Sequence, residues 1–557
     1  MRKSISDPSF EELQPIVKLF NQGQLQQTLP RIAEMLDQFP NSAALYNIYG
    51  ASFAGLMQLD HAIDSYKKAI KIKPDYAEAY NNLGSALNRI GSIEEAIDSC
   101  KQALKIKPNY AEAYNNLGNA QQKNGSMEEA IDSYIQALKI SPNDANAYYN
   151  MGIARQEMGD LQKAIDCYIH ALEINPKYAD AYNNIGAAQK DQNDLEAAIA
   201  SCKKALEINP NYANAYYNMG LALLCAGKRK NALLNFRKSH ELIRGKNPAN
   251  PFHISFSRIS KSKINHDIEQ FIHLAESGCE TEKFQSLAKL YTKISLEIDW
   301  SDEEIQQLSK EHQKQLEETY NRTIKYIEAP ELANGALNSA LEKDKITKDY
   351  FNHDYGLTYV DNFLTHDALN SIRKFLLEST IWFDIKKGGY LGAYLKEGLA
   401  CPLLLQIADE LRGRLPEIFK HHQLKHLWAY KYDSKAHKNN NELTGIKAHA
   451  DQAAVNVNFW ITPASANLNS ESGGLIVYNT DAPLEWGFQA YNSHNSNNKI
   501  DKYLEKASPE KSIIPYNENR AVIFNSNLIH ETDKFEFKEG YENRRINITM
   551  LFGLREN

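Results

Sequence analysis

The sequence predicts a multidomain protein with an N-terminal all-α solenoid, a helical spacer and a C-terminal antiparallel β-domain of jelly-roll type with flanking helices. Three observations support this: a 34-residue repeat, helical periodicity after it, and short alternating strand-like runs beyond residue 425. We place the three domains at 9–246, 247–349 and 350–557. A chain of 557 residues is too long for one hydrophobic core, so several domains are expected.

Composition and charge exclude several functional classes. Apolar residues make up 43% and charged residues 24% of the chain, which is ordinary for globular protein. The net charge of −7 argues against binding by bulk electrostatics, so no nucleic-acid partner is expected. The sequence contains neither a signal-peptide core nor a run of about 18 apolar residues, so we expect no membrane association and a cytoplasmic location. The six scattered cysteines fit reduced, mostly buried thiols there.

The solenoid is predicted from residues that recur every 34 positions. Glycine and alanine let paired helices approach closely, and proline ends the second helix of each pair because it cannot continue the hydrogen-bond ladder. We expect the recurring tyrosines to fill the interhelical core. The pattern resembles the tetratricopeptide repeat, with six clear repeats at 43–246 and a degenerate one at 9–42. The recurring residues are Pro40, Pro74, Pro108, Pro142, Pro176 and Pro210; Gly50, Gly84, Gly118, Gly152, Gly186 and Gly220; Ala62, Ala96, Ala130, Ala164, Ala198 and Ala232; Tyr80, Tyr114, Tyr148, Tyr182 and Tyr216.

A recurring asparagine is less easily explained by packing. It occupies one position of the first helix in five of the six clear repeats, with Ile48 in its place in the first, and this helix is expected to line the inner surface of the solenoid. A row of amides could hold an extended peptide backbone without reading its sequence. The row resembles the asparagine ladder of the O-linked N-acetylglucosamine transferase superhelix, and the alternative interpretation is a solvated helix face. This predicted substrate-binding ladder consists of Asn82, Asn116, Asn150, Asn184 and Asn218.

The spacer shows helical periodicity but no chemistry. A capping box is expected at 301–304, followed by a long solvated helix that reaches Ile327. We expect the spacer to set the geometry between the repeats and the last domain.

The last domain contains a candidate metal-binding set. His449 and Asp451 are two residues apart, so on an extended segment both face the same way. His530 follows an apolar run at 521–524 and would come from another strand. Two histidines and one carboxylate can occupy one face of an iron(II) ion and leave three positions for a co-substrate and dioxygen. The alternative is a polar loop, because H-x-D triplets also arise by chance.

A basic residue near the C-terminus strengthens this hypothesis. Arg545 and Asn547 alternate with apolar residues, so they share one face of a predicted strand. A cation that faces into a β-domain costs free energy without an anion, and a guanidinium can hold a carboxylate by two parallel hydrogen bonds. Tyr430 and Tyr432 share a strand face upstream, where a hydroxyl could donate to the co-substrate; the alternative is core packing. Arg544 is the second candidate for the carboxylate, but its side chain is expected to point to the opposite face of the strand.

Residues 350–557 resemble the iron(II)/2-oxoglutarate dioxygenase superfamily. The motifs follow in order: a tyrosine strand, the H-x-D triplet, a Gly-Gly turn at 473–474, a second histidine, and arginine on the last core strand. The resemblance implies a double-stranded β-helix (jelly roll) in which His449, Asp451 and His530 bind Fe(II). It also implies that Arg545, Tyr432 and Asn547 bind 2-oxoglutarate.

Two subfamilies bear on the substrate. The arginine strand is similar to that of AlkB-type nucleic-acid demethylases, but Leu551 stands where those enzymes carry a second arginine. A repeat array joined to an oxygenase is more similar to the collagen prolyl hydroxylases. We therefore expect a hydroxylase whose protein or peptide substrate is held by the repeat array, with 2-oxoglutarate converted to succinate.

Three alternative functions fit parts of the sequence. The first alternative is a small-molecule oxygenase whose repeats serve as a protein-interaction scaffold. Removal of residues 1–246 is expected to spare the turnover of a small-molecule oxygenase. The same removal is expected to abolish the turnover of a hydroxylase whose substrate is held by the array. A non-catalytic adaptor is disfavoured by the complete ligand set, and a nucleobase demethylase by the acidic charge and Leu551. The polar segments 433–446 and 485–512 are expected to be long loops, one of which closes over the substrate.

Overall fold

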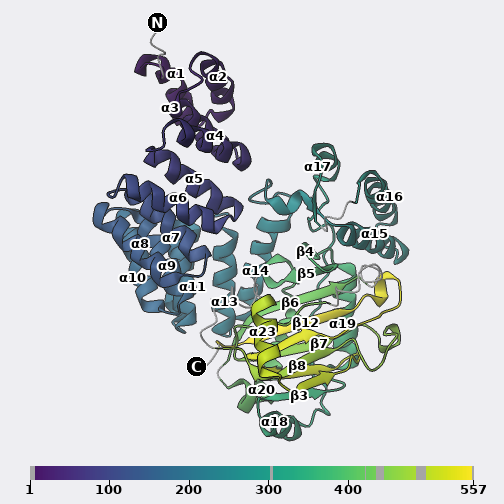
Figure 1. The fold of residues 1–557 in the computed structure, drawn as a ribbon. Helices are drawn as coiled ribbons and strands as arrows, with labels where there is room; N and C mark the ends of the chain where they lie inside the picture. The colour runs from purple at the N-terminus through teal and green to yellow at the C-terminus, as the bar shows by residue number, and fades with distance from the viewer. Residues whose placement is uncertain (1–6, 301–304, 421, 434–444, 484–496, 555–557) are drawn as a thin grey trace. The chain divides into compact units, whose positions relative to one another are not determined.

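The computed structural model describes residues 7–300, 305–420, 422–433, 445–483 and 497–554 (Figure 1). The chain divides into two compact units, Met1–Asp194 and Leu195–Asn557. This boundary lies inside the repeat array, so the second unit contains the last repeat helices together with the β-structure. The domain limits predicted from the sequence, after residues 246 and 349, mark changes of sequence pattern and remain predictions.

The described part of the first unit is a series of paired helices. Each second helix ends two residues before the recurring proline, as the sequence predicted; one ends at Ile72 before Pro74, and another at Ile140 before Pro142. The helices are α1 (Phe10–Asn21), α2 (Leu25–Gln38), α3 (Ala43–Gly55), α4 (Leu59–Ile72), α5 (Ala77–Ile90), α6 (Ile93–Ile106), α7 (Ala111–Lys123), α8 (Met127–Ile140), α9 (Ala145–Glu157), α10 (Leu161–Ile174) and α11 (Ala179–Asp191).

The recurring glycines create the close approach within each helix pair. A Cβ atom at Gly118 would lie 2.6 Å from a ring carbon of Tyr134, so only glycine admits that ring. Cys100 takes the ring's position against Gly84 and is fully buried, in agreement with the predicted burial of the cysteines. The expected core role of the Tyr80 series was wrong in part, because those tyrosines are half-buried. The buried ring comes instead from the second helix of the pair, where it packs against the glycine of the first helix, as Tyr134 does against Gly118.

The last repeat helices belong to the core of the second unit. They are α12 (Leu195–Ile208), α13 (Ala213–Cys225) and α14 (Arg229–Arg244). Leu221, Leu233 and Phe236 join the same apolar cluster as the sheet that follows. Ion pairs reinforce this packing: Arg229 pairs with Glu331 at 3.1 Å and with Asp409 at 3.0 Å, and Arg244 pairs with Glu397 at 3.0 Å with both side chains buried. The final repeat is therefore a structural part of the C-terminal unit.

The predicted long helix of the spacer was wrong. Helices α15 (Lys261–Glu276) and α16 (Thr281–Glu297) precede a single short helix, α17 (Lys310–Leu316), and the chain is irregular from there to residue 342. Tyr320 is buried, and Asn321 has a φ of 53°, a left-handed conformation that does not continue a helix. Burial of this segment against its neighbours overrides its helical sequence pattern. The expected capping box at 301–304 lies outside the described residues.

The C-terminal part contains a seven-stranded and a three-stranded antiparallel sheet. The larger has the order β3-β10-β7-β12-β6-β5-β4 and the smaller the order β11-β8-β9. The strands are β3 (Leu357–Val360), β4 (Asp384–Lys386), β5 (Tyr390–Tyr394), β6 (Leu424–Tyr432), β7 (Val455–Trp460), β8 (Leu475–Asp481), β9 (Lys511–Ile514), β10 (Ala521–Asn525), β11 (Leu528–Thr532) and β12 (Ile546–Phe552), with a separate two-stranded pair of β1 (Arg258–Ile259) and β2 (Gln306–Gln307).

The two faces of the larger sheet differ in chemistry. One face, with Ile548 and Met550 of β12 and Val457 of β7, packs into the main apolar cluster of the unit. Helices contribute to that cluster: α18 (Lys343–Asn352), α19 (His366–Glu378), α20 (Pro402–Arg414) and α21 (Pro416–Phe419). The other face combines aromatic and polar side chains. Trp460 and Phe524 of this face share an apolar cluster with Val477 of the smaller sheet. The polar residues of the same face hold the candidate site.

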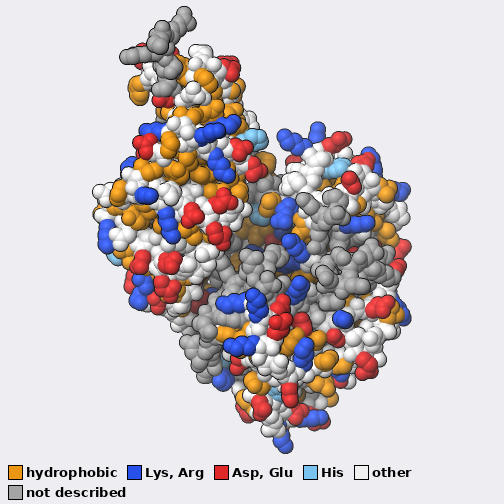
Figure 2. All heavy atoms as spheres, in the orientation of Figure 1, with side chains coloured by type: hydrophobic (Ala, Val, Ile, Leu, Met, Phe, Trp, Pro, Cys, Tyr) orange, Lys and Arg blue, Asp and Glu red, His pale blue; other side chains and the backbone are white. Residues whose placement is uncertain are grey.

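Several remaining expectations can be compared with the described residues. The segment predicted as a loop at 485–512 contains the helix α23 (Asn497–Ala507), and its residues 484–496 lie outside the described part. Four of the six cysteines are buried, in agreement with the sequence. Within the described residues, no helix combines the length and apolar character needed to cross a membrane. Acidic and basic side chains lie intermixed over the face drawn in Figure 2.

Candidate metal centre

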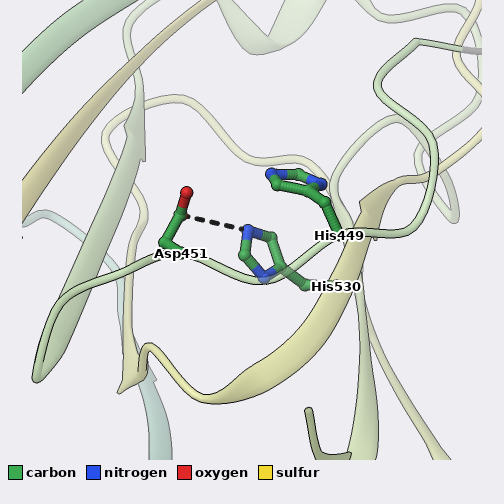
Figure 3. Close-up of side chains that lie close together, drawn as sticks. All are labelled: His449, Asp451 and His530. Carbon is green, nitrogen blue, oxygen red and sulfur yellow. Dashed lines mark ion pairs between the residues drawn. The ribbon is translucent and has the colours of Figure 1, made fainter. Parts of the chain in front are cut away.

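The structure brings together the three residues of the predicted metal-binding set. One candidate ligand atom from each of His449, Asp451 and His530 lies within 4.8 Å of the others. The backbones of the two histidines pair as an antiparallel bridge, with N–H to carbonyl distances of 3.0 and 2.8 Å. Their rings lie 4.3 Å apart, and the Asp451 carboxylate approaches Nε2 of His530 at 3.5 Å (Figure 3). This arrangement presents two nitrogens and one oxygen to a common point.

The backbone fixes the orientation of both imidazole rings. Nδ1 of His449 lies 2.9 Å from the carbonyl oxygen of Lys447, and Nδ1 of His530 lies 3.0 Å from that of Leu528. A carbonyl oxygen can only accept, so each Nδ1 donates a proton. Each Nε2 therefore carries the lone pair that a metal requires. A register shift between Leu528 and His530 in the pairing with β8 helps to aim the second ring.

A row of buried polar side chains supports the carboxylate. Asn456 of β7 donates to Asp451 at 2.6 Å, and Asn458 donates to Asn456 at 2.8 Å. Thr549 of β12 donates to Asn458 at 2.5 Å. The two asparagines were missed in the sequence, although the alternation V-N-V-N inside a strand that is buried throughout could have identified them. A buried polar row of this kind orients a metal-binding carboxylate.

Electrostatics keeps the candidate ligands in forms that can bind a cation. Burial lowers the pKa of His449 to about 4, and the neighbouring His530 adds to that effect. Burial alone would raise the pKa of Asp451, but the two neighbouring imidazoles, His530 and His449, outweigh that effect, so this pKa lies below its usual value. At neutral pH His449 is therefore neutral and Asp451 is ionised.

Arg545 is buried on the same sheet face, next to Tyr432. Its Nε donates to the carbonyl of Gly473 at 2.8 Å, and its Nη2 donates to that of Gly474 at 3.2 Å. Its guanidinium lies 4.8 Å from the centre of the Tyr432 ring. Among the described residues no carboxylate lies within ion-pair distance of Arg545, and burial lowers its pKa. The Gly-Gly turn thus positions the guanidinium through two carbonyl groups. Carbonyl groups carry no net charge, so the positive charge of Arg545 is not balanced by an anion among the described residues.

Two polar atoms at this position, one in the guanidinium and one next to it, lack hydrogen-bond partners. They are Nη1 of Arg545 and the hydroxyl of Tyr432, both buried. The Oδ1 atom of Asn547 is also buried without a partner, while its Nδ2 lies 3.4 Å from Asn458. Unpartnered buried donors cost free energy, and an anion with two acceptor oxygens would satisfy Nη1 and the hydroxyl together. Nε and Nη2 already donate to carbonyls, so of the guanidinium nitrogens only Nη1 remains without a partner, and the binding of a carboxylate there stays a prediction.

Arg544, the basic residue next to Arg545, points to the opposite face, as expected. It pairs with Glu269 at 2.9 Å and with Asp433 at 3.7 Å.

The ladder asparagines are half-buried and connect successive repeats. Asn82 donates to Asn47 at 3.0 Å, and Asn150 donates to Asn115 at 3.1 Å. Asn116 likewise donates to Asn81 at 2.8 Å, and Asn184 to Tyr149 at 3.1 Å; Asn218 occupies the equivalent position in the second unit. Each of these four bonds joins a residue to one 35 positions earlier. In these four asparagines one amide hydrogen is thus used between repeats, and the substrate-binding role of the ladder stays a prediction.

Comparison with protein families identifies the repeats. Family profiles described as tetratricopeptide repeats match residues 58–91, 86–125, 109–177, 143–210 and 201–233. The N-terminal part of the chain therefore consists of tetratricopeptide repeats, which in general bind proteins or peptides. No curated protein matches the chain.

Solved structures similar to the chain include other repeat proteins. The APC/C hetero-tetramer Cut9-Hcn1 matches with a TM-score of 0.37 at 19% identity; the match covers 40% of this chain and 44% of that one. The MamA protein matches with a TM-score of 0.28 at 32% identity, over 31% of this chain and 93% of that one. YrrB, described as a TPR protein with an unusual peptide-binding site, matches with a TM-score of 0.28 at 23% identity, over 33% of this chain and 95% of that one.

Proposed function

We propose that the C-terminal domain is an iron(II)/2-oxoglutarate-dependent dioxygenase that hydroxylates a protein or peptide held by the repeat array. The observation that carries the proposal is the convergence of His449, Asp451 and His530, with both Nε2 atoms free to bind. Two imidazoles and one carboxylate on one side of an ion are typical of non-haem iron(II) oxygenases. Iron bound there would supply the activation of dioxygen that couples 2-oxoglutarate decarboxylation to hydroxylation.

The strand order supports a double-stranded β-helix for this domain. In the larger sheet β6, β12, β7 and β10 are neighbours, and in the smaller sheet β11, β8 and β9 are neighbours. The segment around His449 pairs with β11 and extends the smaller sheet. Successive segments of the chain from β6 onward therefore alternate between two four-segment layers, except for the adjacent pair β8 and β9. This alternation is the topology that two facing sheets of a jelly roll require.

The residues around Arg545 support 2-oxoglutarate as the co-substrate. Its distal carboxylate would accept from Nη1 of Arg545 and from the hydroxyl of Tyr432, the two buried donors without partners. The guanidinium stays charged in every accessible pH range, so it would neutralise that carboxylate. Trp460 and Phe535 lie beside the guanidinium, at 5.8 and 5.5 Å from their ring centres, and keep water from it. These side chains bind and orient the co-substrate and exclude solvent.

The test of this function is succinate formation from 2-oxoglutarate by the purified chain with iron(II) and dioxygen. Replacing Arg545 with alanine is expected to raise the KM for 2-oxoglutarate by more than about thirtyfold, because it removes a charge-assisted hydrogen bond to a buried carboxylate. Arg545→Lys retains the charge but loses the planar donors, so an intermediate KM is expected. Steady-state succinate assays give both values.

Folding of the Arg545 variants needs its own measurement, because the side chain also holds the carbonyls of Gly473 and Gly474. Thermal unfolding monitored by circular dichroism reports whether each variant is intact. A folded Arg545→Ala protein with an unchanged KM would contradict the assigned role. Absence of succinate from the wild-type chain with iron(II) would contradict the oxygenase itself.

We expect the repeat array to bind the polypeptide substrate through the asparagine ladder. The triple change of Asn82, Asn150 and Asn184 to alanine is expected to weaken binding of unstructured peptides by about tenfold, because three amides that can bond to a peptide backbone are lost. Fluorescence anisotropy with a labelled pool of randomised peptides measures the affinity.

A matched control separates peptide binding from repeat stability. The bonds between repeats disappear equally when their acceptors are changed, as in Asn47→Ala, Asn115→Ala and Tyr149→Phe. This control variant keeps all three ladder amides and is expected to retain peptide affinity. Equal loss of affinity in both variants would show that the ladder acts only between repeats.

A further inference from the structure

Aromatic side chains gather on the face of the larger sheet that carries Asn547 and Thr549, outside the metal-binding set. Tyr390 and Tyr394 come from β5, and Trp428 and Tyr430 come from β6. The Tyr430 ring lies 5.2 Å from that of Tyr390, edge to face, and 6.5 Å from that of Tyr394, also edge to face. Trp428 lies 6.3 Å from Tyr430. All four are half-buried, so their rings line an accessible surface and not a closed core.

One carboxylate completes this aromatic cluster. Asp384 of β4 lies across from Gly392, which in turn lies across from Tyr430. Gly392 has no side chain, and the ring of Tyr394 lies over it, so close that a Cβ there would stand 3.0 Å from a ring carbon. The hydroxyl of Tyr394 can therefore reach Asp384, to which it donates at 2.9 Å. The cluster thus has aromatic walls and one anionic group.

A cation from the chain itself already contacts this cluster. Nζ of Lys386 lies 2.7 Å from the carboxylate of Asp384 and 5.6 Å from the centre of the Tyr394 ring. Ammonium groups are attracted to a ring face within about 6 Å and to a carboxylate at contact distance. The lysine side chain is about one-third exposed. A partly exposed lysine on a short edge strand can leave at little cost and admit another cation.

The cluster lies beside the candidate metal centre on the same sheet face. Tyr430 is paired with Asn547 of β12, and Trp428 is paired with Thr549. Thr549 donates to Asn458, in the row of amides that ends at Asp451. A group bound among the tyrosines would therefore lie on the sheet face that also carries the row of polar side chains leading to Asp451.

The combination of groups discriminates between ligand classes. Aromatic rings without a charge would suit an apolar side chain, and a carboxylate without rings would form an ordinary surface ion pair. Rings and a carboxylate together favour a cation that also has an aliphatic stem. We propose that Tyr390, Tyr394, Tyr430 and Asp384 form a subsite for a lysine or arginine side chain of the substrate, which displaces Lys386. This proposal rests on the oxygenase function and names its substrate class.

The test measures binding of a small cation to the full chain without metal. The probe is Nα-acetyl-lysine amide, and the comparison ligand is Nα-acetyl-norleucine amide, which has a similar stem and no charge. Ligand-observed NMR titration gives both dissociation constants. Asp384→Asn is expected to raise the dissociation constant of the lysine probe by about tenfold, because a charged hydrogen bond is lost. Lys386→Gln is expected to lower it by about threefold, because the competing cation is removed.

Asp361→Asn is the matched control. Asp361 also pairs with a cation, Arg520, which lies over the ring of Tyr359, but this group lies on the edge strand β3 and its loop. The control is expected to bind the lysine probe as the wild type does. Equal affinity for lysine and norleucine probes, or no effect of Asp384→Asn, would overturn the subsite.

The subsite and the oxygenase can fail separately in these measurements. Probe binding uses the metal-free chain and does not depend on turnover, whereas succinate formation does not depend on the lysine probe. Succinate formation without probe selectivity would overturn the cationic subsite and leave the oxygenase. Selective probe binding without succinate formation would leave a cation-binding site and overturn its assignment as part of an oxygenase.

Discussion

Replacement of His530 by alanine is expected to lower iron(II) affinity by more than about a hundredfold and to abolish succinate formation from 2-oxoglutarate. The change removes one of three ligand atoms and the ring that approaches Asp451 at 3.5 Å. It also removes the ring whose tautomer the Leu528 carbonyl fixes. The remaining nitrogen and oxygen cannot define one face of an ion. Anaerobic iron(II) titration and the succinate assay measure the two losses.

A histidine remote from the centre provides the control for this change. His366 is exposed at the first position of α19 and takes no part in the cluster of candidate ligands. His366→Ala is expected to match the wild type in metal affinity and turnover. His449→Ala should repeat the His530→Ala result, since each histidine supplies one nitrogen. Full iron(II) affinity in a folded His530→Ala protein would eliminate this set as the metal centre.

Removal of residues 1–194 is expected to leave a folded C-terminal unit, whereas removal of residues 1–246 is expected to unfold it. The second truncation deletes α13 and α14 and with them Leu221, Leu233 and Phe236 of the main core. Loss of each such side chain costs roughly 2–5 kcal/mol, and the whole unfolding free energy of a domain is about 5–15 kcal/mol. Circular dichroism during thermal unfolding distinguishes a cooperative transition from its absence.

Removal of residues 1–246, which the sequence suggested as a test of substrate capture, is therefore not informative. A truncation at residue 246 would lose turnover whether or not the repeats bind substrate, because the domain itself would fail to fold. A chain that begins at residue 195 keeps the pair of Arg244 with Glu397 and both pairs of Arg229. Retained succinate formation with lost peptide binding in that chain would support substrate capture by the array. A cooperative transition in the chain that begins at residue 247 would contradict the structural role of the last repeat.

The sequence predicted regular features well because they depend on local rules. The 34-residue period located the helix pairs, and the prolines located their ends, as at Pro74 after Ile72. The spacing of His449 and Asp451 also predicted correctly that both side chains face one point. Glycine contacts, proline positions and strand alternation are each properties of a few neighbouring residues.

Features set by distant contacts could not be predicted in this way. The period is uniform across residue 194, so nothing in the repeats marks where one compact unit ends. The helical pattern near Tyr320 was overridden by its burial. The carbonyls of Gly473 and Gly474, which occupy two nitrogens of Arg545, come from a turn about seventy residues earlier in the chain. Only the folded sheets bring such groups within hydrogen-bond reach.

The carbonyls two residues before each histidine have a consequence for metal exchange. Both rings are oriented by their own backbone, at 2.9 and 3.0 Å, and so are set once the strands pair. An ion bound by the proposed oxygenase would therefore meet ligands that are already in place. Manganese(II) or cobalt(II) would then replace iron(II) in the same geometry without refolding, and a chelator would remove the ion while the sheets stay intact.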